Sequence, residues 1–157
     1  MSTSSDMKKT FYSTPNHPYE KRYGYYRAVR KGPFIAVAGT TPYDAETQKL
    51  LHPGDAGKQA AAIFTEIIKA IKAVGSKGAE DVIRVRVFLA VRSSQTLPSH
   101  LADIIVQNME DIEAVGNAFS AVFAKDGGEM GVAMTAVITG FVDSDMLVEI
   151  EADAVVD

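Results

Sequence analysis

The chain has 157 residues, of which 46% are hydrophobic and 23% are charged, and its net charge is −4. This length suits one domain with a full core, and an acidic chain lacks the basic face that phosphate groups require, so no nucleic acid is expected as a partner. Cysteine is absent and the three histidines are far apart, so we expect no disulfide, no thiolate nucleophile and no metal site.

The first residues, 1–20, are polar, contain Pro15 and Pro18 and show no periodicity. They predict a flexible N-terminal arm, followed by a single domain over 21–157. They also lack the apolar core of a signal peptide, and no apolar run elsewhere approaches the roughly 20 residues of a membrane span. We therefore expect a cytoplasmic protein without membrane contact.

A hairpin and a helix come next. Residues 23–30 and 34–38 are extended segments on either side of a turn at 31–33, and the second is apolar throughout, which is typical of a central strand. Residues 55–75 have apolar side chains at every third or fourth position and begin with Asp55, a favourable helix cap. This pattern predicts an amphipathic helix with one buried face.

The second half of the chain repeats this alternation of strand and helix. Residues 81–91 alternate as in a strand, 93–108 predict a loop leading into a short helix, 111–125 predict a second main helix, and 132–140 predict a further strand. With the final strand described below, the order ββαβαββ indicates a two-layer α+β domain. Helices on one face leave the other face free. Its apolar candidates, Phe88, Met134 and Ala136, would be buried by self-association.

The last strand, LVEIEADAV over 147–155, is apolar on one face and acidic on the other. Glu149, Glu151 and Asp153 share the acidic face, and three aligned carboxylates are costly to bury without partners. The face is therefore either solvated or part of a site. Ion pairing with Arg84 and Arg86 of the earlier strand is the structural interpretation.

Several segments in their joint order resemble the Rid family, also called YjgF or L-PSP proteins. These segments are GYYRAVRKGPFIAVAGTTP, GDAGKQAAAIFTEIIKAI, GAEDVIRVRVFLA, VGNAFSAVF and LVEIEADAV. The match covers about 23–155, with an insertion near 92–107. The resemblance implies a chorismate-mutase-like α+β fold and a homotrimer whose sheets face its centre. It also implies ligand clefts between subunits, where active members hydrolyse enamines and imines without a cofactor.

The resemblance also implies site residues. Glu149 matches the carboxylate that positions a water, Tyr25 matches an aromatic residue at the cleft, and Gly39 matches a glycine that permits close approach. Met134 falls where active deaminases have an arginine that binds the substrate carboxylate. Loss of such a bidentate contact weakens binding by roughly ten- to a hundredfold, so standard 2-aminoacrylate deamination is not expected.

Other residues are weaker candidates for ligand binding. Arg86 is a hypothetical substitute for the missing arginine, and Glu151 lies beside Glu149 on the same strand face. Thr40 sits where a strand opens toward the cleft, although capping of a turn explains it nearly as well. Arg27 alternates in step with Tyr25 and would point toward the same cleft.

The expected function is binding of a small metabolite in clefts of a homotrimer, and whether the chain also turns it over is left open. An enzyme would be a cofactor-free hydrolase, deaminase or tautomerase acting on an imine- or enamine-type compound, with Glu149 as the catalytic group. The alternative is a non-catalytic ligand-binding or chaperone-like protein. Endoribonuclease activity is a weaker alternative, because the chain is acidic and lacks a histidine pair.

Overall fold

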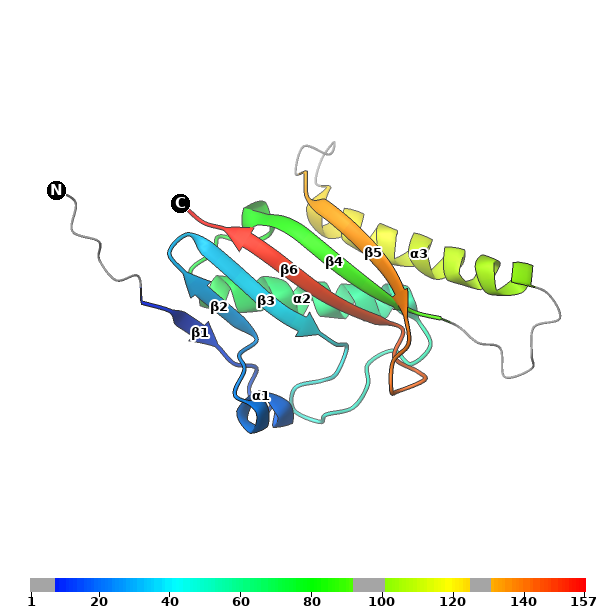
Figure 1. Cartoon of the computed structure of the whole chain (residues 1–157), viewed down its shortest axis with the longest axis horizontal. Helices are drawn as coiled ribbons and strands as arrows, with labels where there is room; N and C mark the ends of the chain where they lie inside the picture. Colours follow the sequence, from blue (N-terminus) through cyan, green and yellow to red (C-terminus); the bar gives the residue numbers. More distant parts are fainter. Residues whose placement is uncertain (1–7, 92–100, 125–130) are drawn as a thin grey trace.

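A single six-stranded sheet with two long helices on one face forms the domain (Figure 1). The computed structural model describes residues 8–91, 101–124 and 131–157. The strand order is β1-β2-β3-β6-β4-β5. The elements are β1 (Thr10–Tyr12), α1 (Pro18–Tyr23), β2 (Ala28–Lys31), β3 (Phe34–Thr40), α2 (Ala56–Ala73), η1 (Ala79–Asp81), β4 (Val82–Ala90), α3 (Leu101–Phe123), β5 (Ala133–Thr139) and β6 (Val148–Val155). The predicted two-layer α+β architecture is confirmed.

Helix α2 forms where the periodicity predicts it. The Asp55 side chain accepts a hydrogen bond from the Lys58 backbone N–H at 2.9 Å, which satisfies one of the free donors of the first turn. Its apolar stripe is buried against the sheet and against the C-terminal half of α3, where Phe64 packs edge-on to Phe123 with ring centroids 5.5 Å apart. This contact fixes α2 beneath the centre of the sheet.

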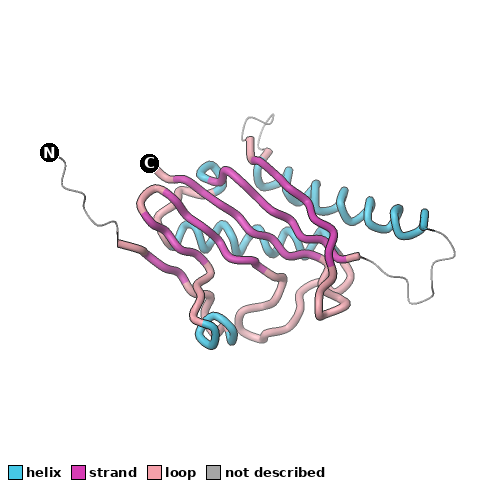
Figure 2. The backbone as a smooth tube through the Cα atoms, viewed as in Figure 1, coloured by secondary structure: helices cyan, strands magenta, loops and turns pink. Residues whose placement is uncertain are grey.

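Strand β6 is the central strand that organises the sheet (Figure 2). It pairs antiparallel with both β3 and β4, and its even-numbered residues are buried while its odd-numbered residues are partly exposed. The predicted alternation is confirmed. β5 does not pair with β6, however, because it runs parallel to β4 on the far side of that strand.

The N-terminal part is more ordered than the sequence predicts. Within the expected flexible arm, β1 pairs with β2, and α1 begins at Pro18 with His17 as its cap. The helix ends at Gly24, whose φ of 72° is the left-handed conformation that glycine adopts readily. A proline is favourable in the first turn because the backbone N–H groups there have no partner within the helix, so Pro18 starts a helix in a segment that the sequence predicts to be flexible. The first hairpin strand consequently starts at Ala28 rather than at residue 23.

Helix α3 joins the predicted short helix and second main helix into one continuous helix. Residues 101–107 of the expected insertion belong to it, and residues 92–100 lie outside the described part of the chain. Among the described residues, no helix is both long and apolar enough to cross a membrane.

The alternation of buried and exposed side chains predicted for β4 is interrupted near the start of the strand. A register shift between Val82 and Arg84 leaves Val82 buried and Ile83 exposed. Further along, Met134 on β5 lies beside the buried Val85, so it belongs to the helix side of the sheet. The same register places Ala136 on the helix side, and Phe88 remains on the open face.

Candidate functional site

Glu149 is the carboxylate on the acidic face of β6 that forms no ion pair with the described residues. Its neighbour across the ladder is Phe88, whereas the neighbours of Glu151 and Asp153 are Arg86 and Arg84. The Glu149 side chain makes no hydrogen bond with the described residues and is half-buried. Burial, and secondarily the charge of Glu151, raises the pKa of Glu149, while the nearby Arg27 opposes this rise. A carboxylate in this state is suited to accepting a proton.

Gly39 makes room for the Glu149 side chain. It lies at a register shift between β3 and β6, and a Cβ atom placed on Gly39 would overlap Oε1 of Glu149. Glycine is therefore required here by the space beside the carboxylate and not by backbone conformation. The group that closely approaches Gly39 is therefore the Glu149 carboxylate of the protein itself.

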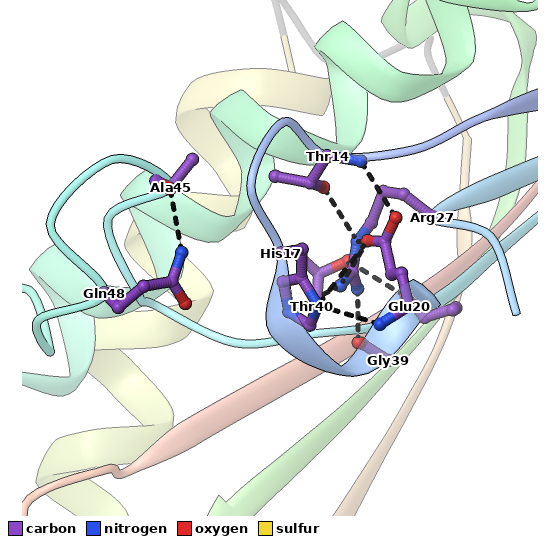
Figure 3. A network of polar contacts seen from close by, with 9 residues as sticks. Thr14, His17, Glu20, Arg27, Gly39, Thr40, Ala45 and Gln48 are labelled. Atoms are coloured by element: carbon purple, nitrogen blue, oxygen red, sulfur yellow. Dashed lines mark hydrogen bonds and ion pairs between the residues drawn. The ribbon is translucent and has the colours of Figure 1, made fainter. Parts of the chain in front are cut away.

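Arg27 is buried beneath the site and is held on all sides by the chain itself (Figure 3). Its Nη1 donates to the Gly39 carbonyl oxygen at 2.6 Å and to Thr40 Oγ1 at 3.2 Å. Its Nε donates to Glu20 Oε1 at 3.2 Å and to Thr14 Oγ1 at 3.3 Å. These contacts tie β2 to the end of β3 and to the N-terminal segment.

Glu20 and His17 of the α1 region complete this network. Glu20 Oε1 lies 3.1 Å from Arg27 Nη2, and the two side chains are only 3% and 4% exposed. His17 Nε2 lies 3.4 Å from Arg27 Nη2. Burial, and secondarily the charge of Arg27, lowers the pKa of His17. His17 is therefore neutral at neutral pH, and the Arg27–Glu20 pair is electrically balanced.

A pocket of about 390 Å³ lies over these groups, between α1, the end of β3 and β6. Its lining combines aromatic rings with a few polar groups, as is common for small-molecule sites. The lining residues are His17, Pro18, Tyr19, Tyr25, Arg27, Gly39, Thr41, Tyr43, Gln48 and Glu149. A wider depression of about 570 Å³ shares His17 and Tyr25 but contains Glu20 in place of Glu149. The narrower pocket is the candidate site because its carboxylate is free.

The structure brings together four of the residues that the sequence singles out, namely Glu149, Tyr25, Gly39 and Arg27. Thr40 lies at the edge of the network, where its hydroxyl donates to the Ala38 carbonyl oxygen at 2.9 Å and accepts from Arg27. It is buried, and both of these contacts of its hydroxyl are made within the chain.

Arg86, Glu151 and Met134 do not line this pocket. Arg86 Nε lies 2.7 Å from Glu151 Oε2, and its Nη1 lies 3.0 Å from Asp153 Oδ2. The structural interpretation of Arg86 therefore applies, and its proposed role as an anion receptor is not supported by its contacts. Met134 is separated from β6 by β4 and belongs to the opposite side of the sheet from Glu149. The next residue of β5, Thr135, lies on the same side of the sheet as Glu149, so this strand presents no arginine on that side at this position either.

Sequence reasoning gave little weight to Arg27 and missed His17, Glu20 and Tyr43. One local signal was available, because His17-Pro18 followed by Glu20 is a helix start with a polar cap and an acidic first turn. The pairing of Glu20 with Arg27 depends on how the chain turns at Gly24. Among the described residues, no group of three or more histidine and carboxylate side chains is placed to hold a metal ion.

The fold places this molecule among the YjgF-type α+β proteins. The structure of Rv2704 from Mycobacterium tuberculosis, a member of the YjgF/YER057c/UK114 family, superposes with a TM-score of 0.70 at 26% identity and covers 95% of this chain and 100% of that one. The YjgF gene product of E. coli has the same fold, with a TM-score of 0.67 at 22% identity over 96% of this chain and 100% of its own.

Sequence comparison agrees with the fold. The model of the family "Endoribonuclease L-PSP" matches residues 16–96. The Streptomyces coelicolor protein SCO2049 is 33% identical over 137 residues, which cover 87% of this chain and 85% of that protein. A RutC family protein of Pyrococcus abyssi is 30% identical over 130 residues, or 83% of this chain and 84% of its own length. The chain belongs to the L-PSP family, also known as YjgF, RutC or Rid proteins.

Proposed function

We propose that this protein binds a small metabolite in the Glu149 pocket and hydrolyses or tautomerises an imine- or enamine-type group there. The observation that supports this most directly is the free carboxylate of Glu149. It lies on the wall of an aromatic pocket with a raised pKa and no hydrogen bond from the described residues. The two carboxylates that follow it on the strand both form ion pairs with Arg86 and serve the sheet.

The chemistry requires only water and a proton carrier. Glu149 accepts a proton from a water molecule whose oxygen attacks the imine carbon, and the C=N π electrons move to nitrogen. The carbinolamine that forms then receives this proton on nitrogen. The C–N bond breaks, ammonia leaves, and the hydroxyl proton passes to Glu149 as the carbonyl forms. The pocket needs no metal or cofactor for these steps, and the tyrosine rings limit the entry of bulk water.

The assembly is proposed to be a homotrimer whose open sheet faces meet at its centre. Support comes from the apolar side chains on that face, because Phe34 is 66% exposed and Val137 is 41% exposed in the single chain. Light scattering during size-exclusion chromatography is expected to give three times the chain mass of 16.9 kDa. A monomer at micromolar concentration would contradict the trimer.

Turnover is tested with imines made in place by coupled enzymes. One is 2-aminoacrylate, which has a carboxylate, and the other is the imine that an amine oxidase forms from phenethylamine. Glu149→Gln is expected to abolish acceleration, whereas Glu46→Gln, an exposed carboxylate outside the pocket, leaves it unchanged. Unaccelerated decay of both imines by a folded wild-type protein refutes the catalytic proposal and favours a non-catalytic binder. RNA is not proposed as a substrate, because the chain is acidic and Arg27 is fully engaged.

A further inference from the structure

The guanidinium of Arg27 is the sole permanent cation among the residues that line the Glu149 pocket, and it is not available to a ligand. Each of its three nitrogens has two polar contacts within the chain, and the side chain is 4% exposed. A ligand carboxylate would have to displace buried contacts to reach it. The pocket therefore presents no fork of donors to an anion.

The charges around the pocket sum to a negative value. Glu20 neutralises Arg27 at 3.1 Å, and His17 is neutral because burial and Arg27 lower its pKa. Glu149 remains as the uncompensated charge in the lining, and its strand neighbour Glu151 adds to the negative potential although Arg86 partly offsets it. An anion entering the pocket would meet repulsion, and a cation would supply the missing countercharge.

Aromatic rings form much of the remaining wall. Tyr43 is held by a hydrogen bond from its hydroxyl to Asp143 Oδ2 at 2.6 Å, and Tyr25 packs edge-on to His17 with ring centroids 6.3 Å apart. The negative face of a tyrosine ring attracts a cation, and its surface also packs well on a flat apolar group. A volume of about 390 Å³ lies at the small end of ligand pockets.

From these three features we infer that the pocket selects small, flat, positively charged molecules, namely protonated amines or iminium ions without a carboxylate. This inference rests on the proposed function only in using the same pocket. The positive group lies against Glu149, and the flat apolar part lies among Tyr19, Tyr25 and Tyr43. Protonation of an imine also makes its carbon more electrophilic, so the ligand class and the hydrolysis proposed above require the same form of the substrate.

Three probes of matched shape test the selection on the full-length protein. They are phenethylamine, which is cationic, 3-phenylpropionate, which is anionic, and 2-phenylethanol, which is neutral. Titration is followed by calorimetry and by the backbone amide signals of Gly39 and Gln48, which both line the pocket. Phenethylamine is expected to bind at least about tenfold more tightly than 3-phenylpropionate and to shift both signals.

Substitution of the carboxylate shows whether it is the cause. Glu149→Gln is expected to weaken phenethylamine about tenfold and to leave 2-phenylethanol unchanged, because only the amine uses the negative charge. The matched variant Glu46→Gln leaves all three affinities unchanged. Equal or tighter binding of 3-phenylpropionate, no binding of phenethylamine, or an amine affinity that survives Glu149→Gln would each overturn the inference.

The two proposals fail in different ways. Glu149-dependent binding of phenethylamine without acceleration of either imine supports the ligand class and refutes the catalysis. Glu149-dependent turnover of 2-aminoacrylate, with no turnover of the phenethylamine-derived imine, supports the catalysis and refutes the ligand class.

Discussion

Gly39→Ala tests the site by filling the space that the Glu149 carboxylate occupies. The added Cβ would overlap Oε1 of Glu149 and lie 3.1 Å from its Cδ. The backbone at Gly39 is not in the left-handed region, so alanine is conformationally acceptable there. The strain is therefore relieved by rotation of the Glu149 side chain, which is flexible and lies at the open pocket.

The expected cost in stability is small and the expected cost in function is large. A displaced rotamer costs about 0.5–1.5 kcal/mol, which lowers Tm by no more than about 6 °C in a chain of this size. Misplacing a general base reduces kcat by roughly a hundredfold or more. Thermal unfolding measures the cost in stability, and imine turnover measures the cost in function. Phenethylamine affinity is a second measure of the carboxylate position.

Gly140→Ala is the matched control for this change. Gly140 is exposed, has ordinary φ, and a Cβ on it would meet no atom within 4 Å. It should leave Tm, turnover and affinity at wild-type values. If Gly39→Ala folds normally and also keeps wild-type turnover and amine affinity, the position of Glu149 does not matter and the site is wrongly assigned.

Three further substitutions probe the charges of the site. Turnover should fall as the pH drops through the pKa of Glu149, which lies above its ordinary value of 4.5. A raised pKa also means that ionisation of Glu149 destabilises the folded protein. Glu149→Gln should therefore raise Tm at pH 7 but not below about pH 4. A Glu149→Gln protein that is less stable at pH 7 would contradict this. Glu20→Ala leaves Arg27 buried without its partner and should cost about 3–5 kcal/mol in chemical denaturation, so a loss below about 1 kcal/mol counts against a tightly buried pair. Arg86→Gln breaks two ion pairs that are one-third exposed and should cost no more than about 1 kcal/mol, with phenethylamine affinity no weaker than in the wild type; weaker amine binding would assign Arg86 to the site.

Local patterns in the sequence determined the elements whose stability depends on their own residues. The alternation of β6, the apolar stripe of α2 and the Asp55 cap are all properties of neighbouring side chains, and all three appear as predicted. The segments that carry the family resemblance led to the fold class and to Glu149 and Gly39. These predictions needed no knowledge of which strands lie side by side.

Tertiary structure alone decided which charges of the acidic strand are paired. Register places Phe88, not an arginine, opposite Glu149, and a shift of two residues along β4 would have placed Arg86 opposite Glu149 and left Asp153 without an arginine. The face to which Met134 belongs follows in the same way from the pairing of β5 with β4. Register is set by contacts between residues far apart in the chain, which a pattern within one strand does not record.

The buried network beneath the pocket also depends on the tertiary structure. Arg27, Glu20 and Thr40 come from three different segments, and they meet because the chain turns at Gly24 and brings Arg27 within hydrogen-bond distance of both Glu20 and Thr40. From sequence, each is an ordinary polar residue. Their burial together makes Arg27 a closed structural group and leaves Glu149 as the one uncompensated charge in the lining, because the free energy of a buried charge depends on its partners in space and not on its neighbours in the chain.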